Sequence, residues 1–383
     1  MKPYLFSCIR RRSIEVLILL LLTAELWASS SIAHSFTLNL PGAQEPIKCF
    51  ETEGGFLVFA QEKEQGRILA IELDTDLHLK KLVALDRVSF TKLNDVTQDI
   101  LGGFVLAGYE IISKQSRIKI AILDEKLSVV FQHSVPVSGA DQWAESLICE
   151  EKDLIIVGGH RTTGSNWYDA LVMRIDHDGE ILWSKRVGGS SDEWFSGVCK
   201  LNGKYLCFGS TESYGNGQAD FWGCLFSENG NRYWCTTFGG QRWERAVGCA
   251  RTQDSIVLVG SSNSFTPYNA LFVVKVDPYG RTVWQKTIDL GNDFTTKGAL
   301  THEDIVLVYG ELWQNDTRRD ISYLLLDQNG ILITQRTLRE PNDQRVVEIV
   351  PLESKRMLIL AASDNPHSST DIQLYLIQQD IKN

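Results

Sequence analysis

The sequence lacks the short motifs by which many enzymes are recognised. It contains no G-x-S-x-G nucleophile elbow, no H-E-x-x-H zinc motif and no glycine-rich phosphate-binding loop. Its seven histidines are scattered, and no two cysteines have the C-x-x-C spacing of a metal or redox site. We therefore expect no cofactor, no metal and, as the leading hypothesis, no catalytic residue.

Long apolar runs and helical patterns are also scarce. Residues 34–383 show no sustained 3.6-residue periodicity, which argues against a helical fold. The apolar run at residues 16–24 is well short of the roughly 20 residues that span a bilayer. It follows Lys2 and three arginines and precedes small residues up to Ala33, the order typical of a secretory signal peptide. We predict that residues 1–33 are a signal peptide, cleaved after Ala28 or Ala33, and that the protein is secreted, extracytoplasmic or periplasmic. An uncleaved N-terminal anchor is the alternative.

Basic residues are fewer than acidic ones. The chain has 38 Lys and Arg against 48 Asp and Glu, a formal net charge of −10. Residues 1–33 hold four basic and two acidic side chains, so their removal would make the charge −12. An acidic surface repels phosphate backbones, and we expect no nucleic-acid partner.

The sequence does contain a repeat of about 50 residues. Six alternating apolar runs end at Asp74, Asp124, Asp176, Ser227, Asp277 and Asp327. A glycine follows three positions after the last four of these, and a tryptophan four positions later in three cases, giving D-x-x-G-x-x-x-W. The glycine supplies the positive φ of a tight turn, so the unit predicts strand, turn, strand.

Each period holds further β-rich runs, and two of them occur in seven copies. Four short strands every 50 residues predict an all-β, seven-bladed propeller with four antiparallel strands per blade. The expected blades span approximately residues 41–85, 86–136, 137–187, 188–238, 239–288, 289–338 and 339–383. The last blade ends after its third strand, so we predict that residues 35–40 complete it and close the ring, pairing with residues 372–377.

The fourth blade carries a resemblance to a known family. It reads Gly188-Gly189-Ser190-Ser191-Asp192, then Ser213-Tyr214-Gly215-Asn216-Gly217, Asp220-Phe221-Trp222, Gly230 and Trp234. This resembles the tandem propeller repeat of exported bacterial and archaeal proteins. The likeness is strong in blades three to five and fades in the others. It implies a fold and not a reaction, because such propellers serve many roles.

Aromatic residues give the candidate binding site. In a propeller, the loops between second and third strands share one face with the loops that link blades. These segments are rich in aromatic residues in blades three to six and almost devoid of them elsewhere. Aromatic groups rimmed by polar ones mark interaction sites. The candidate ligand-binding residues are Trp143, His160, Trp167, Tyr214, Tyr268 and Trp313. The alternative is that Trp143, with Trp194 and Trp243, packs blades together.

Seven cysteines remain after residue 33, so at least one must be unpaired within the chain. Cys49, Cys149, Cys199 and Cys249 lie near one place in the first strand of four blades, but their register drifts. We predict small core residues there, with no metal and no disulfide between blades. Cys224 and Cys235 flank one hairpin turn, and directly opposed strand positions disfavour a disulfide.

The leading functional hypothesis is a non-enzymatic binding propeller outside the cytoplasm, with a glycan or a protein on the aromatic face of blades three to six. The alternative is an enzyme, either a quinone-cofactor dehydrogenase or a polysaccharide-active propeller. Glycoside hydrolysis needs two carboxylates about 5–10 Å apart, and Asp141, Asp192 and Glu244 are the candidates.

Overall fold

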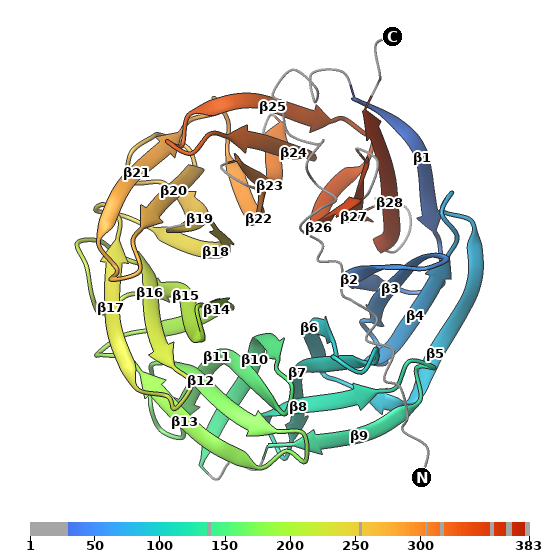
Figure 1. The fold of residues 1–383 in the computed structure, drawn as a ribbon, viewed down its shortest axis with the longest axis horizontal. Helices are drawn as coiled ribbons and strands as arrows, with labels where there is room; N and C mark the ends of the chain where they lie inside the picture. Colours follow the sequence, from blue (N-terminus) through green and yellow to red (C-terminus); the bar gives the residue numbers. More distant parts are fainter. Residues whose placement is uncertain are drawn as a thin grey trace, which may run out of the picture.

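The computed structural model is a ring of seven four-stranded antiparallel sheets (Figure 1). It describes residues 30–135, 139–252, 255–302, 305–314, 318–352, 356–364 and 370–379. The prediction of an all-β, seven-bladed propeller is confirmed. Within these residues no helix has the length and apolarity to cross a membrane. The proposed signal peptide lies almost entirely outside them.

Each blade runs outward from the axis through four strands. The innermost strands are β2 (Gln44–Thr52), β6 (Lys92–Gln98), β10 (Ala140–Cys149), β14 (Glu193–Leu201), β18 (Glu244–Arg251), β22 (Phe294–His302) and β26 (Asp343–Leu352). The second strands are β3 (Gly55–Glu62), β7 (Phe104–Ile112), β11 (Asp153–Thr162), β15 (Lys204–Thr211), β19 (Ile256–Ser262), β23 (Ile305–Gln314) and β27 (Arg356–Asp364). The third strands are β4 (Arg67–Leu73), β8 (Gln115–Leu123), β12 (Asp169–Asp176), β16 (Asp220–Ser227), β20 (Ala270–Val276), β24 (Arg318–Leu326) and β28 (Thr370–Gln379). The outer strands are β5 (Leu79–Ser89), β9 (Val129–Ser134), β13 (Ile181–Val187), β17 (Arg232–Phe238), β21 (Thr282–Ile288), β25 (Leu332–Leu338) and β1 (Ser30–Leu38).

The core lies between neighbouring sheets rather than in one central layer. Second and third strands are covered on both faces, so β16 is buried along almost its whole length. Outer strands such as β13 keep most of their residues exposed or half-buried. Each apolar cluster joins two adjacent blades, which explains why the middle strands are nearly continuous apolar runs.

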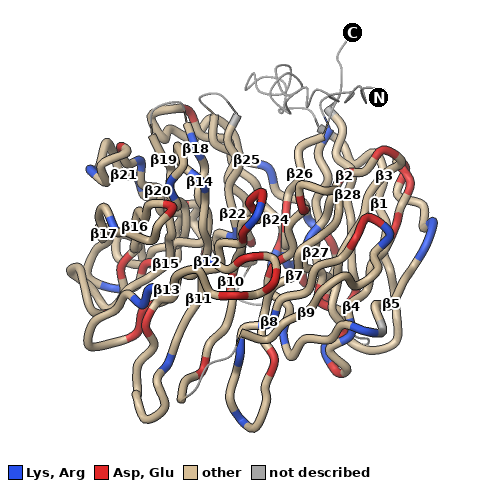
Figure 2. Tube along the Cα trace, turned by 60° about the horizontal axis from the view of Figure 1, so that its bottom comes forward, with Lys and Arg blue, Asp and Glu red and all other residues tan. Residues whose placement is uncertain are grey.

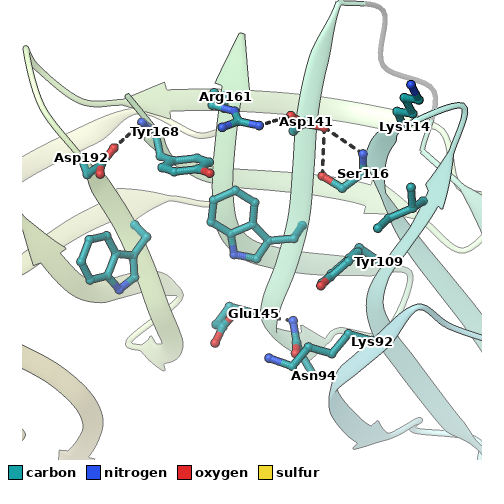
Figure 3. A pocket seen from close by; sticks show the side chains of 13 residues that line it. Lys92, Asn94, Tyr109, Lys114, Ser116, Asp141, Glu145, Arg161, Tyr168 and Asp192 are labelled. Atoms are coloured by element: carbon teal, nitrogen blue, oxygen red, sulfur yellow. Dashed lines mark hydrogen bonds and ion pairs between the residues drawn. The ribbon is translucent and has the colours of Figure 1, made fainter. Parts of the chain in front are cut away.

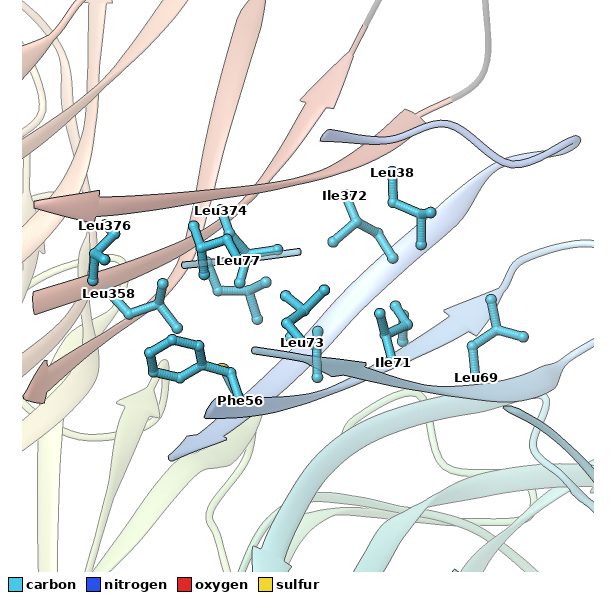
Figure 4. Packing of buried hydrophobic residues seen from close by; sticks show 14 of the residues in the cluster. Leu38, Phe56, Leu69, Ile71, Leu73, Leu77, Leu358, Ile372, Leu374 and Leu376 are labelled. Atoms are coloured by element: carbon cyan, nitrogen blue, oxygen red, sulfur yellow. The ribbon is translucent and has the colours of Figure 1, made fainter. Parts of the chain in front are cut away.

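The N-terminal strand closes the ring as predicted. In Figure 1, β1 lies beside β28, and Leu38 pairs with Ile372 and Ser35 with Tyr375. Leu38 and Ile372 pack into one cluster with Leu69 and Ile71 of the first blade (Figure 4). The strand begins at Ser30, so it includes Ala33, one of the two predicted cleavage positions.

The D-x-x-G-x-x-x-W unit joins one blade to the next. Trp183 Nε1 donates a hydrogen bond to the carbonyl of Glu228, at 2.9 Å, in the turn of the following blade. The ring of Trp183 lies over Gly230 of that turn. Trp234 and Trp284 repeat both contacts one and two blades later. The glycine therefore provides the positive φ of its own turn and the space for a neighbouring ring.

The two cysteine predictions are wrong. Cys199 of β14 and Cys249 of β18 form a disulfide between blades four and five, with a Cα–Cα distance of 6.8 Å. Innermost strands converge near the axis, which brings such residues within the span of a disulfide. Cys224 and Cys235 are also bonded, because they face each other on β16 and β17 at a Cα–Cα distance of only 4.1 Å. Cys49, Cys149 and Cys207 are free thiols.

Candidate functional site

A β-bulge recurs at one level of all seven innermost strands. In β10, for example, the pairing shifts between Ala144 and Ser146 and leaves Glu145 unpaired. The equivalent extra residues are Ile47, Asn94, Glu145, Ser196, Val247, Lys297 and Val347. Bulges re-aim side chains at the rims of closed sheets. Five of these seven residues line a cavity of about 490 Å³ bounded by innermost strands of blades one, two, three, six and seven.

A second cavity of about 600 Å³ opens on the upper face, which we define as the face with the second-to-third-strand loops and the loops linking blades. Blades two, three and four form its walls (Figure 3). Its lining combines aromatic rings with charged groups of both signs: Tyr109, Trp143, Tyr168, Trp194, Lys92, Lys114, Arg161, Asp141, Glu145 and Asp192. We call this cavity the upper cleft. It adjoins the first cavity, because both are lined by Lys92, Asn94 and Glu145.

The aromatic wall of the upper cleft is fixed by packing. The ring of Trp143 covers Gly159 of the paired strand, where any side chain would collide with it. Tyr168 meets Trp143 edge to face, with ring centroids 5.1 Å apart. The guanidinium of Arg161 lies 5.0 Å from the centre of the Tyr168 ring. The rings are therefore held in place before any ligand arrives.

Two carboxylates brace this wall. Asp141 accepts hydrogen bonds from Arg161 Nη2 at 2.7 Å and from the backbone N–H of Ser116 at 2.9 Å. Partial burial raises the pKa of Asp141, but the bonds from Arg161 and Ser116 outweigh it, so the pKa is lowered from its ordinary value. Asp192 accepts from the backbone N–H of Tyr168 at 2.7 Å. Both carboxylates act as positioning groups.

The inner end of the upper cleft is polar. Lys92, Asn94 and Glu145 lie together there (Figure 3). Asn94 Nδ2 donates to the carbonyl of Ala144 at 2.6 Å. Burial raises the pKa of Glu145, and the positive charges of Lys92 and Arg245 oppose this without cancelling it. This end offers hydrogen-bond donors and an acceptor beside the aromatic wall.

Ion pairs lie near the axis in blades six and seven. Lys297 Nζ lies 3.0 Å from Glu311, and Arg319 bonds Asp343. Arg345 lies 3.2 Å from Glu45 of the first blade. Over the whole chain, acidic and basic residues are interspersed along the trace in Figure 2. The aromatic wall of the upper cleft comes from blades two, three and four.

The predicted site residues separate into different places. Trp143 lines the upper cleft. His160 is buried, with Nδ1 2.8 Å from Gln142 Nε2, and burial and the charge of Arg186 lower its pKa. Trp167, Tyr214 and Tyr268 are about half exposed on loops of blades three, four and five. Trp313 is half-buried, and Arg319 lies over its ring at 5.3 Å. The structure brings only Trp143 of these six into the cleft.

Sequence reasoning missed Lys92, Asn94, Tyr109 and Glu145. Asn94 and Glu145 follow from the bulge, whose position depends on strand register and is not seen in the spacing of apolar residues. Tyr109 lies in strand β7 of blade two, whose second-to-third-strand loop has no aromatic residue. Comparing the seven first strands position by position would have shown Glu145 as the one carboxylate at a position that is apolar in three blades, at Ile47, Val247 and Val347.

The third carboxylate considered for hydrolysis is structural. Glu244 is 1% exposed and accepts hydrogen bonds from the backbone N–H of Gly240 at 2.8 Å and from Ser262 Oγ at 2.7 Å. Glu193 makes the same bonds in the preceding blade. A group that recurs with the same partners in two blades belongs to the architecture.

Comparisons with known proteins agree on the fold. No protein-family model and no curated protein matches the chain. The β-propeller domain of the Trilobed protease from Pyrococcus furiosus is similar, with a TM-score of 0.51, 10% identity, and coverage of 91% of this chain and 96% of that one. A protein of unknown function from Dyadobacter fermentans gives a TM-score of 0.50 at 9% identity, over 92% and 100% of the two chains. At such identities the likeness concerns the fold alone.

Proposed function

We propose that the protein is an exported, non-enzymatic binding propeller that holds a glycan in the upper cleft. The single observation that carries this proposal is the pairing of a fixed aromatic wall with a polar inner end in one cavity. Sugar rings present C–H groups to aromatic faces and hydroxyls to polar groups. Trp143 and Tyr168 would take the first, and Asn94, Lys92 and Glu145 the second.

The size of the cleft favours a glycan over a protein. Its volume of about 600 Å³ lies within the range of small-ligand sites, about 300–1,000 Å³. The half-exposed aromatics Trp167, Tyr214 and Tyr268 lie on loops of blades three, four and five, outside the lining of the cleft. If the ligand proves to be a protein bound to those loops, the proposal of a glycan site in the cleft is wrong.

Export is supported by two separate features. The basic and apolar order of residues 1–33 has the form of a signal peptide. The two disulfides are stable in oxidising compartments and rare in the cytosol. We also propose that the chain belongs to the exported tandem propeller repeat family, on the motifs of blades three to five.

An enzyme remains the second candidate, as a quinone-dependent dehydrogenase or a polysaccharide-active propeller. The observation that favours it is Glu145, a carboxylate whose pKa is raised by burial at the inner end of the cleft. A raised pKa is what a general acid requires. The pKa of Asp141 is lowered instead, and its carboxylate accepts a hydrogen bond from Arg161.

The test is a glycan array probed with the labelled protein, together with an absorption spectrum. We expect binding to a set of related glycans, lost in Trp143→Ala and kept in Trp167→Ala. A visible absorption band in the purified protein, or release of shorter sugars from a bound glycan, would instead establish the enzyme. Binding to no glycan by a folded protein would contradict the proposal.

A further inference from the structure

Three metal-ligating side chains of different kinds meet on the face opposite the upper cleft. They are Asp99, in the turn after β6, Cys149, the last residue of β10, and His177, in the turn after β12. One donor atom from each lies within 4.8 Å of the other two. Cys149 Sγ is 3.7 Å from Asp99 Oδ1 and 4.0 Å from His177 Nε2. All three residues are half-buried.

These separations are close to those of a bound tetrahedral metal. Zinc–sulfur bonds of about 2.3 Å and zinc–nitrogen bonds of about 2.0–2.1 Å place the two donors about 3.5 Å apart. The sulfur is therefore within a few tenths of an ångström of these separations from Asp99 and from His177.

The backbone that carries the ligands is fixed. Asp99 closes its turn through bonds with Gly102 and Gly103. The turn that holds His177 is braced by Asp176, which accepts from the backbone N–H groups of Asp178 and Glu180. Preorganised ligands lose little freedom when a metal binds.

The group is not part of the repeat. At the turn position of His177, the other five copies of the motif have Thr75, Glu125, Glu228, Pro278 and Gln328. The turn therefore forms without a histidine in the other five blades, so the turn itself does not require His177. Features that differ between blades are the ones that can give a propeller a specific property.

We propose that Asp99, Cys149 and His177 bind a divalent metal of the zinc class, with a water in the fourth position. Thiolate and imidazole ligands suit zinc, whereas calcium and magnesium prefer oxygen alone. Asp99 belongs to blade two and the other two ligands to blade three, so the metal cross-links adjacent blades. This proposal departs from the expectation that Cys149 binds no metal, an expectation that concerned a ring of four thiols. A histidine and a carboxylate replace the other thiols here.

Cobalt(II) titration of the purified full-length chain, freed of metal and with its free thiols reduced, tests this proposal. We expect one equivalent to bind with a thiolate-to-cobalt charge-transfer band. Cys149→Ser should abolish that band, and His177→Gln should weaken binding by more than roughly tenfold, the scale that even loss of a supporting residue reaches. At a zinc concentration that just saturates the wild type, the melting temperature should rise most in the wild type and less in either variant.

The matched control is His78→Gln. His78 Nδ1 lies 3.0 Å from Asp74 in the equivalent turn of blade one. The variant therefore removes a histidine that is paired with an aspartate but is not one of the proposed ligands. This variant should bind cobalt like the wild type. The proposal is overturned if the wild type binds without a sulfur band, or if the band persists in folded Cys149→Ser.

Discussion

The turn between the third and outer strands contains a residue with positive φ, and this residue is of two kinds. In blades three to six the turn residue with positive φ is glycine, as at Gly230, with φ 75°. In blades one and two it is Leu77 and Leu127, with φ 67° and 63°. Both leucines are buried in the core between blades. A left-handed leucine is therefore tolerated where its own side chain fills the space that a neighbouring ring covers elsewhere.

Replacing Gly230 with alanine should show how much stability depends on the space that this glycine leaves for the ring of Trp183. Its Cβ would lie 2.8 Å from Trp183 and would also require the left-handed region. We expect a loss of unfolding free energy on the order of 1–3 kcal/mol, measured by urea denaturation. The control is Gly291→Ala, where φ is 78° and no atom lies within 4 Å. Equal losses in the two variants would show that the contact with Trp183 does not matter.

Among the described strands, the Cys199–Cys249 disulfide joins the innermost strands of blades four and five. It closes a loop with a sequence separation of 50, whereas Cys224–Cys235 closes one of 11 inside a single blade. Constraint of the unfolded chain grows with loop length, so the first bond should contribute more to stability.

Two double variants test this order. Cys199→Ala/Cys249→Ala should lower the unfolding free energy by about 2–4 kcal/mol, and Cys224→Ala/Cys235→Ala by less. Chemical denaturation gives both values. A reducing agent that opens the disulfide should bring the wild type towards the first variant. The reverse order of losses would mean that packing, not chain constraint, governs these bonds.

The strands also show how far sequence reasoning reached. The 50-residue period, the glycine turns and the closing strand could all be predicted, because each depends on local spacing or on the count of strands. The upper cleft could not, since it depends on bulges that turn Asn94 and Glu145 towards one cavity. His160 lies in a segment expected at the binding edge, yet it is buried within its blade because β11 runs as far as Thr162.

For the whole molecule, ring closure combines strand pairing with charge. Arg345 of blade seven bonds Asp364 at 2.9 Å and lies 3.2 Å from Glu45 of blade one. Burial raises the pKa of Asp364, but hydrogen bonds from Arg345 and Thr370 outweigh it, so the pKa is lowered from its ordinary value. The same balance lowers the pKa of Glu45, through Lys63 and Arg345.

Acid should therefore weaken the closure. A carboxylate with a lowered folded pKa stabilises the fold above its unfolded pKa of about 4, and this stabilisation is lost as the pH falls through the folded pKa. We expect Arg345→Gln to lower stability at pH 7 and to flatten the acid side of the stability–pH curve. The control is Lys81→Gln, which should leave both unchanged, because Lys81 is an exposed residue of the outer strand β5 and lies 3.8 Å from Glu72 of β4. If the acid side of the stability–pH curve is the same in Arg345→Gln as in the wild type, these ion pairs do not stabilise the closed ring.

The central claim is that the upper cleft binds a glycan through its fixed aromatic wall, and calorimetric titration tests it most directly. A glycan found on the array is titrated into the wild type, Trp143→Ala, Trp143→Tyr and Trp167→Ala, with melting curves to establish folding. The account predicts about a tenfold or greater loss in Trp143→Ala, equivalent to about 1.4 kcal/mol, partial retention in Trp143→Tyr and wild-type affinity in Trp167→Ala. Wild-type affinity in a folded Trp143→Ala, with loss in Trp167→Ala, would contradict it and place the ligand on the loops.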